Sequence, residues 1–303
     1  MIKTFGDMYS YLRQHAVRRR MVAMWAMDEH TVLAAAAAQK LGFIDAILVG
    51  DENRIREICN GNDVDASCLK IVNEPDEFAA IDLSVNLIRE GKGDFLMKGL
   101  CSSEKFLRAI LNKESGLLPK GGLLLHVGVM ESPNYHKLLF MGDNAVIPLP
   151  DYEKKKEITR QLVKVAHAFG LESPKVAFIS ATEQVLRSQP ATEDAAMLTK
   201  WVERGEEKID CVADGPLALD VAIDSNSARI KNVRGSVAGD ADVLVFPNLE
   251  SSNVFWKTNS KLCRGVKLAG MLVGTTVPCV LASRADDMET KLNSIAEAVM
   301  FVK

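Results

Sequence analysis

A hydroxyl, a guanidinium and several carboxylates follow an apolar run near the C-terminus. The run occupies residues 277–281, and Ser283, Arg284, Asp286 and Glu289 come after it. If the run forms a strand, these side chains bring a hydrogen-bond donor, a fixed cation and a candidate base to its carboxyl end. Open α/β sheets bind ligands at that edge, and the N-terminus of a following helix attracts anions. The segment therefore predicts a site for an anionic ligand.

A second group of polar residues follows the apolar run 95–97. Gly99 ends this predicted strand, and a helix is predicted to start after Ser102 and Ser103, with Arg108 in its second turn. Either serine suits the N-cap position, which leaves backbone amides exposed to an anion. Arg108 fits two descriptions, a solvated surface charge or a clamp on a phosphate.

Two further predicted strands end in polar residues. One strand is predicted to end at Asp214, where Gly215 allows a close backbone approach and the next residue, a proline, suits the first position of a helix. The strand 243–246 leads to Asn248 and Asn253, whose amides both donate and accept hydrogen bonds. Taken singly, each motif is explained at least as well by capping, turn or surface roles. Four strand ends with anion-compatible groups at one edge together favour a phosphate-bearing ligand.

The elements that position these residues alternate between strands and helices. Strands are predicted over residues 21–26, 44–49, 95–97, 123–129, 137–141, 175–179, 211–213, 243–246 and 279–282. Helices are predicted over residues 31–41, 53–58, 77–89, 103–111, 152–169, 192–204, 217–223, 251–268 and 287–299. Such alternation predicts an α/β fold, with mainly parallel sheets covered by helices on both faces.

Two domains are predicted from interruptions of this pattern. Pro148 and Pro150 precede a charged helix start, and a second crossing is expected near residues 270–274. Domain I would then be discontinuous, with residues 1–148 plus 273–303, and domain II would hold residues 149–272. A cleft between two domains is a common place for a ligand site.

Composition excludes several classes of protein. The chain has 303 residues, of which 48% are apolar and 25% charged, and its net charge is −3, as in ordinary globular proteins. The near-neutral charge and the lack of a long basic tract argue against a nucleic-acid partner. The sequence has no run of about 18 apolar residues to span a membrane and no signal-peptide pattern. Six cysteines without a C-x-x-C pair suggest free thiols, and we expect a cytoplasmic protein.

Motifs for nucleotide and metal chemistry are missing from the sequence. It contains no Walker A segment, no G-x-G-x-x-G, no H-E-x-x-H and no G-x-S-x-G. The five histidines are scattered, and His126 lies in a predicted apolar strand, where a structural imidazole is expected. We therefore predict neither a metal site nor a tightly bound cofactor.

These residues, in this order, resemble the phosphate acetyl/butyryl transferase family. Residues 214–220 resemble the D-G-P-x-x-x-D segment of the family, residues 241–249 resemble A-D-V-L-V-x-P-N-L, and Asn253 resembles a later asparagine. Residues 283–292 match S-R-A-D-x-x-E-T-K-L, which is typical of the butyryl branch, and residues 97–100 also look closer to that branch. The resemblance covers essentially the whole chain.

The resemblance implies a reversible acyl transfer, in which acyl-CoA and inorganic phosphate give acyl phosphate and coenzyme A. Coenzyme A is then a substrate or product, and the partners are acyl-CoA and phosphate. The family also implies two α/β domains with an active-site cleft between them, related to isocitrate and isopropylmalate dehydrogenases. A homodimer or a higher homo-oligomer is expected.

The resemblance also implies roles for individual residues. Ser283 and Arg284 correspond to a catalytic serine–arginine pair. The catalytic carboxylate has no exact counterpart, and Asp286, Asp287 and Glu289 are candidates, of which Glu289 fits best by position and Asp286 second. Arg108 corresponds, with a one-residue gap, to an arginine of the first domain.

Three other functions remain open at this stage. A phosphate acetyltransferase would share all of these motifs, because the acyl pocket is not visible in a sequence. A nicotinamide-dependent decarboxylating dehydrogenase would need a metal-binding aspartate cluster and an adenine loop, which we do not find. A non-catalytic acyl-CoA-sensing module is disfavoured by the presence of Ser283 and Arg284.

Overall fold

The chain divides into two compact units, which are described separately. The structure is a computed structural model that describes residues 2–205, 207–281 and 286–302. Unit 1 comprises Met1–Thr4 and Leu125–Lys267, and unit 2 comprises Phe5–Leu124 and Leu268–Lys303. The domain boundaries predicted from the sequence, after residues 148 and 272, lie at other positions and stay a prediction.

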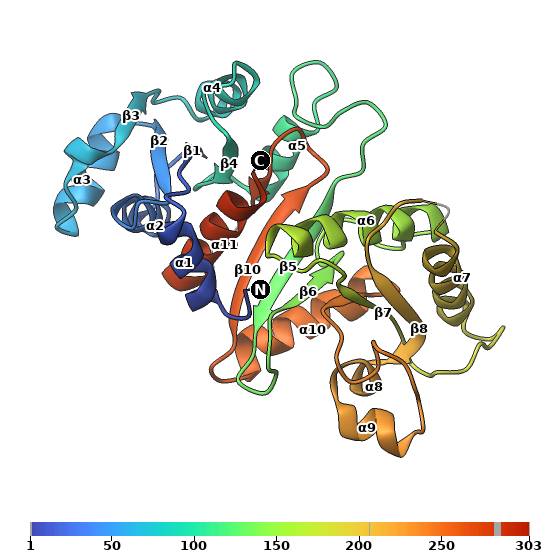
Figure 1. The fold of residues 1–303 in the computed structure, drawn as a ribbon. Helices are drawn as coiled ribbons and strands as arrows, with labels where there is room; N and C mark the ends of the chain where they lie inside the picture. Colours follow the sequence, from blue (N-terminus) through green and yellow to red (C-terminus); the bar gives the residue numbers. More distant parts are fainter. Residues whose placement is uncertain (1, 206, 282–285, 303) are drawn as a thin grey trace. The chain divides into compact units, whose positions relative to one another are not determined.

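Unit 2 contains elements from both the N-terminal and the C-terminal part of the chain. Its first elements are α1 (Phe5–Gln14), β1 (Arg19–Met24), α2 (Glu29–Lys40), β2 (Ile44–Gly50), α3 (Glu52–Gly61), the 3-10 turn η1 (Ala66–Cys68), β3 (Lys70–Asn73), α4 (Glu77–Arg89), β4 (Phe95–Lys98) and α5 (Ser103–Ile110). It is completed by β10 (Lys267–Val273), β11 (Cys279–Val280) and α11 (Met288–Phe301). Figure 1 shows these elements along the chain.

The strands of unit 2 form a mainly parallel sheet, as predicted. Their order is β3-β2-β1-β4-β11-β10, and only the β10–β11 pair is antiparallel among the pairings described for this unit. The chain moves outward from β1 through α2 to β2, and it returns from β3 through α4 to β4. Because such crossovers are right-handed, α2 and α4 must cover opposite faces of the sheet. α2 packs against α11, and α4 packs against α5.

Unit 1 is also built from strands and helices that alternate along the chain. Its elements are β5 (Leu125–Glu131), β6 (Leu139–Gly142), α6 (Tyr152–Ala168), β7 (Lys175–Ser180), α7 (Pro190–Arg204), β8 (Val212–Ala218), α8 (Leu219–Ile223), α9 (Ser225–Ile230), β9 (Val243–Val245) and α10 (Leu249–Leu262). The strand order is β5-β6-β9-β7-β8, with β5 antiparallel to β6 and the other pairs parallel. Phe140, Phe169 and Phe178 are buried against this sheet.

Aspartates define where several helices begin. The side chains of Asp28, Asp51, Asp76 and Asp151 each accept a hydrogen bond from a backbone amide in the first turn of α2, α3, α4 and α6. An N-cap of this kind stabilises a helix by about 1 kcal/mol relative to alanine. These caps are local signals, which is why the predicted helix starts lie within a few residues of the observed ones.

Two predicted elements were wrong. The strand predicted to end at Asp214 continues to Ala218, so Pro216 lies in β8 rather than in a helix. β8 is an edge strand with a register shift opposite Ala177 and Ile179, which tolerates a residue without an N–H. The helix predicted to reach residue 268 ends at Leu262, because the buried run that follows forms β10. Periodicity alone does not separate a short buried strand from a helix end.

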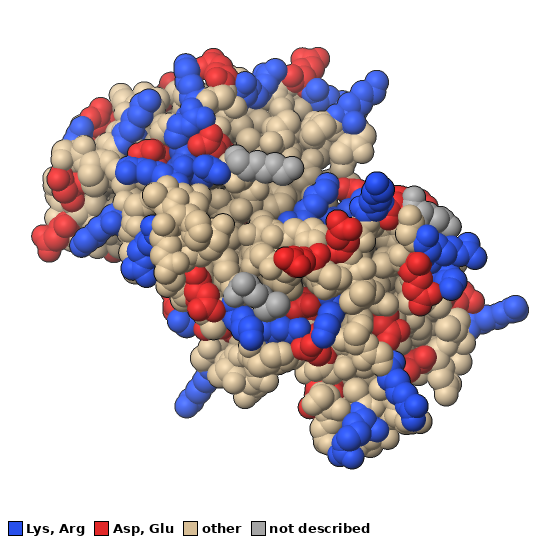
Figure 2. All heavy atoms as spheres, viewed as in Figure 1, with Lys and Arg blue, Asp and Glu red and all other residues tan. Residues whose placement is uncertain are grey.

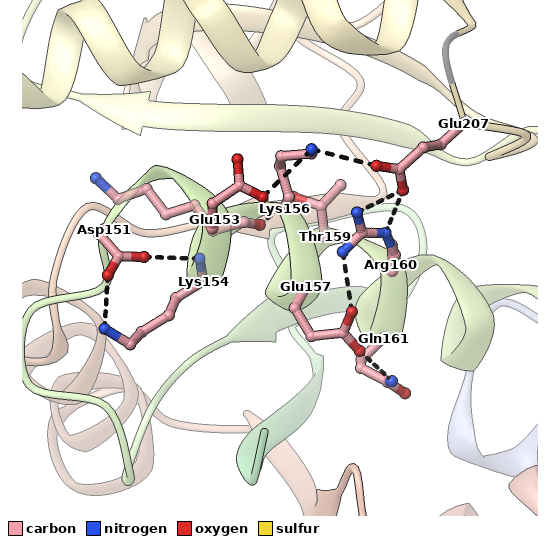
Figure 3. A network of polar contacts seen from close by, with 10 residues as sticks. Asp151, Glu153, Lys154, Lys156, Glu157, Thr159, Arg160, Gln161 and Glu207 are labelled. Atoms are coloured by element: carbon pink, nitrogen blue, oxygen red, sulfur yellow. Dashed lines mark hydrogen bonds and ion pairs between the residues drawn. The ribbon is translucent and has the colours of Figure 1, made fainter. Parts of the chain in front are cut away.

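Charged side chains hold α6 against the segment that follows α7. Arg160 contacts Glu157, at 3.0 Å, and Glu207, and Lys156 lies 3.2 Å from Glu207. Figure 3 shows Glu207 approached by both cations, with Glu157 on the other side of Arg160. Because these groups are partly exposed, the network adds little stability.

Over the face drawn in Figure 2, positive and negative side chains are interspersed. None of the described helices has the length and apolar character to cross a membrane.

Glu297 is an unusual feature of the core of unit 2. This residue of α11 is 0% exposed, and neither of its carboxyl oxygens has a hydrogen-bond partner among the described residues. Burial raises the pKa of Glu297 well above its usual value. The folded protein therefore keeps this carboxyl protonated to a higher pH than the unfolded chain, which loses the proton near pH 4.3.

We predict that Glu297 makes the protein less stable as pH rises. Above the unfolded pKa, the free energy of unfolding should fall by about 1.4 kcal/mol per pH unit until the folded pKa is reached. Glu297→Gln removes this dependence, so its stability advantage in urea denaturation should be larger at pH 8 than at pH 5. Glu114→Gln, on the exposed surface, controls for the substitution itself. A difference between Glu297→Gln and the parent protein that is equal at both pH values would contradict the prediction.

Candidate functional site

The segment with the predicted serine–arginine pair starts at the carboxyl edge of the sheet in unit 2. β11 runs parallel to β4, with Val280 opposite Met97, so both strands end at the same edge. Ser283 and Arg284, which follow three and four residues later, lie outside the described residues. The described part of the chain therefore shows the strand that leads to them, but not their side chains.

The three candidate carboxylates have different surroundings. Asp287 is the N-cap of α11, and its side chain accepts a hydrogen bond of 2.8 Å from the backbone amide of Thr290. Glu289 lies in the first turn of α11 and is exposed, and Asp286 is half-buried. The capping bond gives Asp287 a structural role, which leaves Asp286 and Glu289 as the candidates for a base.

The helix α5 carries the next group of predicted residues. Ser102 is its N-cap and accepts a hydrogen bond of 3.2 Å from the amide of Lys105, whereas Ser103 is the exposed first residue of the helix. Arg108 forms an ion pair of 2.7 Å with Glu104 on the same helix, and its side chain is 76% exposed. The structure thus decides between the two serines as caps and places Arg108 on the surface.

Lys98 is a residue that the sequence reasoning did not select. It is the last residue of β4, is only 3% exposed, and donates hydrogen bonds to the carbonyl oxygens of Gly99, at 2.9 Å, and Cys101, at 3.1 Å. A Cβ atom on Gly99 would lie 2.3 Å from the carbonyl oxygen of Trp25, so only glycine fits there. A lysine directly after an apolar strand and before a glycine was the available signal. Lys98 holds the turn that leads to α5.

In unit 1, the polar residues gather where β6 and β9 end. Asn248 is the N-cap of α10 and accepts a hydrogen bond of 2.9 Å from the amide of Ser251. The side-chain amide of Asn253 donates to the carbonyl oxygen of Asn144 at 3.0 Å. The two predicted asparagines therefore lie at one edge, where Asn253 of α10 is hydrogen-bonded to the loop after β6.

Asp214 and Gly215 are not at that edge. Asp214 pairs with Ala177 in the middle of β7, and its side chain accepts a hydrogen bond of 2.8 Å from the amide of Gly215. Burial raises the pKa of Asp214. The prediction that a strand ends here failed, and with it the argument that placed these two residues at a carboxyl edge.

A buried polar cluster next to Asn253 was missed by the sequence reasoning. His126 on β5 is 7% exposed, and its Nδ1 lies 3.4 Å from Nδ2 of Asn144. Ser252 on α10 donates to Oδ1 of Asn144. Asp143 accepts hydrogen bonds from the backbone amides of His126, at 2.9 Å, and of the three residues after Asn144. Burial lowers the pKa of His126 to about 4 and raises that of Asp143.

A surface cavity in unit 1 lies at the opposite end of the strands. Its volume is about 480 Å³, and it is lined by residues near the starts of β7 and β9, among them Lys137, Lys175, Asp240 and Asp242. Lys137 contacts both aspartates, at 2.8 and 2.7 Å. Burial opposes ionisation of Asp240, but hydrogen bonds from Lys137 and Lys175 lower its pKa to about 2. These charges pair with one another, so we assign this cluster to structure.

We predict that Lys98 stabilises the turn after β4. Lys98→Met leaves two carbonyl oxygens without this donor, and it should lower the free energy of unfolding by about 2–3 kcal/mol in urea titrations. Lys113→Met, at an exposed position, is the matched control and should have little effect. An equal effect of the two substitutions would show that Lys98 does not hold the turn.

Comparisons with known proteins agree on one family. A family model described as phosphate acetyl/butaryl transferase matches residues 77–299. The chain is 44% identical to phosphate butyryltransferase of Clostridium acetobutylicum over 300 residues, which cover 99% of this chain and 98% of that protein. It is 38% identical to phosphate acetyltransferase of Rhizobium meliloti over 274 residues, covering 90% of this chain and 86% of that protein.

A solved structure is similar over nearly the whole chain. A branched-chain phosphotransacylase from Enterococcus faecalis superposes with a TM-score of 0.81 and 28% identity, covering 94% of this chain and 99% of that one. The resemblance inferred from the motifs is thereby confirmed. The chain is an acyltransferase that belongs to the phosphate acetyl/butaryl transferase family.

Proposed function

We propose that this enzyme transfers a butyryl group, or an acyl group of similar size, between coenzyme A and inorganic phosphate. The reaction is acyl-CoA plus phosphate giving acyl phosphate plus coenzyme A, and it is reversible. The observation that carries the proposal is the 44% identity to a phosphate butyryltransferase over 99% of the chain. The identity to a phosphate acetyltransferase makes acetyl-CoA the alternative substrate.

The proposed mechanism is a direct transfer within a ternary complex. When acyl phosphate is consumed, a carboxylate takes the proton of the coenzyme A thiol, whose ordinary pKa is about 8.5. The thiolate attacks the acyl carbonyl, and phosphate leaves as the tetrahedral intermediate collapses. In the opposite direction the carboxylic acid returns the proton to the departing thiolate. Glu289 is the first choice for this base by its position in the family pattern, and Asp286 is the second. Asp287 is set aside because its side chain caps α11.

Charge determines the proposed roles of the other catalytic residues. Ser283 donates a hydrogen bond to the thioester, while Arg284 and Arg108 hold phosphate and neutralise developing charge. The remaining rate enhancement comes from holding two substrates in one orientation. Ser283 is not proposed as a covalent nucleophile, since the sequence offers no histidine base beside it.

The remaining residues are proposed as contacts for phosphate or coenzyme A. Asn248 and Asn253 are supported by their position where β9 and α10 meet, and Ser102 and Ser103 by the start of α5. Asp214 and Gly215 have weaker support, because they lie level with the middle of β7.

The architecture of the active site is also a proposal. The family resemblance supports two α/β domains, of residues 1–148 plus 273–303 and 149–272, with the site in a cleft between them, as in isocitrate and isopropylmalate dehydrogenases. It also supports a homodimer or a higher homo-oligomer. We propose a cytoplasmic location on the same basis, together with the free cysteines.

Release of coenzyme A thiol tests the reaction. We expect thiol release from butyryl-CoA only when phosphate is present, with a kcat/KM for butyryl-CoA about 10–200-fold above that for acetyl-CoA. Propionyl-CoA should lie between them. Release without phosphate would indicate a hydrolase, and no release from any of the three would favour an acyl-CoA-sensing module.

The role of Ser283 is tested by removing its hydroxyl. Ser283→Ala should lower kcat about 100-fold or more and leave KM nearly unchanged, because a donor to the transition state is lost. Ser10→Ala, on the exposed surface of α1, is the control. Full turnover by Ser283→Ala would remove this hydroxyl from the chemistry.

The role of Arg108 is tested through the KM for phosphate. Arg108→Ala should raise this KM, while stability should change by less than about 0.5 kcal/mol, because an exposed pair on one helix contributes little. Glu104→Ala breaks the same ion pair and keeps the guanidinium, so it should leave the KM for phosphate near the parent value or lower. If Arg108→Ala also leaves this KM unaltered, the arginine is only a surface residue.

A further inference from the structure

His126 stands at the edge of unit 1 where β6 and β9 end. β5 is antiparallel to β6, with Gly128 opposite Met141, so the start of β5 meets the carboxyl end of β6. The imidazole is nearly buried, and its ring lies edge-on to Trp256 of α10, with 5.8 Å between the ring centres. Nε2 makes no hydrogen bond to any described residue, and it is not among the fully buried atoms that lack a partner. This nitrogen therefore keeps a small accessible surface at the edge of the sheet.

The hydrogen bonds of Asn144 determine which nitrogen of His126 carries the proton. Oδ1 of Asn144 accepts from the hydroxyl of Ser252, so Nδ2 is the atom that faces Nδ1 of His126. If Oδ1 and Nδ2 of Asn144 exchanged places, the buried hydroxyl of Ser252 would lose its hydrogen-bond acceptor among the described residues. Since Nδ1 accepts from Asn144, the proton of the neutral imidazole is on Nε2.

Three features of its surroundings hold Asn144 in place. Its backbone carbonyl oxygen accepts a hydrogen bond from Nδ2 of Asn253 at 3.0 Å. A Cβ atom on Gly128 would lie 2.4 Å from Nδ2 of Asn144 and 2.4 Å from Cζ3 of Trp256, so glycine provides the space for both side chains. Ser252 is itself fully buried. The cluster thus presents one N–H donor in a fixed direction.

A fixed, neutral N–H donor is suited to a carbonyl oxygen that becomes negatively charged during a reaction. Acyl transfer between sulfur and phosphate produces such an oxyanion in the tetrahedral intermediate. A donor held in place before the reaction stabilises this charge without reorganisation. A phosphate group, by contrast, carries its charge before and after the reaction and is matched better by guanidinium groups.

We propose that His126 is a catalytic residue that donates its Nε2–H to the acyl carbonyl oxygen, with Asn144 and Ser252 as positioning residues. The inference rests on the proposed function. The attacking atom forms a bond to the carbonyl carbon, and the π electron pair moves to the oxygen that accepts from Nε2–H. When the intermediate collapses, that pair reforms the carbonyl and the leaving group departs. His126 keeps its proton throughout, so the base remains a separate carboxylate.

The donor is tested with two substitutions at His126. His126→Leu removes the N–H and should lower kcat about 100–1,000-fold, with KM for acyl-CoA changed only a few-fold. His126→Gln can place an amide N–H near the position of Nε2 and should recover a large part of the rate. Equal kcat in the parent protein and His126→Leu would overturn the proposal, as would equally low rates in His126→Leu and His126→Gln when both are folded.

The tautomer is tested with Asn144→Asp, which keeps the shape of the side chain. A carboxylate at this position accepts a hydrogen bond from Nδ1–H, so the single proton of the neutral imidazole lies on Nδ1 and Nε2 has none. At low pH the imidazolium carries a proton on both nitrogens, so kcat of Asn144→Asp should rise as pH falls. The kcat of the parent protein should show no such rise. Among the described residues, His126 also lies against Trp256, which does not titrate, and its backbone amide donates to Asp143.

Further measurements separate the possible failures. Ser252→Ala removes the bond that orients Asn144 and should lower kcat about 10-fold, without a new pH limb. If His126→Leu does not fold, Asn144→Asp decides, and a kcat profile equal to that of the parent protein would overturn the inference. If the parent protein itself releases no thiol in the presence of phosphate, the proposed function fails. An active parent protein with unaffected variants rejects only the role of His126.

Discussion

The side-chain amide of Asn144 is the interaction on which the polar edge of unit 1 depends. It connects three elements, because its nitrogen faces His126 of β5, its oxygen accepts from Ser252 of α10, and its own loop follows β6. Buried polar groups must satisfy one another, since an unpaired donor or acceptor costs about 1–3 kcal/mol. The amide has one donor side and one acceptor side, so satisfying Ser252 also determines the protonated nitrogen of His126. The need to pair the buried hydroxyl of Ser252 thereby determines which nitrogen of His126 can donate a hydrogen bond.

In unit 2, the carboxyl edge of the strands depends on a buried cation. Lys98 ends β4 and directs its ammonium group to the carbonyl oxygens of the following turn. A buried cation of this kind is stable only when carbonyl or carboxylate oxygens surround it. Gly99 then lies so close to Trp25 that β1 and β4 end in contact with each other. The strand that leads to Ser283 lies next to β4, so the turn after Lys98 begins beside the end of β11.

Several polar side chains have an architectural role as helix caps. Asp287, Asn248 and Ser102 accept hydrogen bonds from the first turns of α11, α10 and α5. Among the acids near the C-terminus, capping narrows the choice of a base to Asp286 and Glu289. Glu297 in the same helix is different, because its carboxyl is buried and has no hydrogen-bond partner in the part of the chain that the structure describes. Its pKa is raised as a consequence.

The sequence by itself determined the family, the reaction class and most of the alternation of strands and helices. These depend on neighbouring residues, such as an apolar run of strand length, an aspartate before a helix, or the string that follows Ser283. Only the tertiary structure decided that Asp214 lies inside an edge strand, that Asp287 is a cap, and that His126 meets Asn144 and Ser252. Asn144 is 18 residues from His126 and 108 residues from Ser252. Hydrogen-bond partners at such separations leave no local pattern, because their pairing is set by the order and direction of the strands that bring them together.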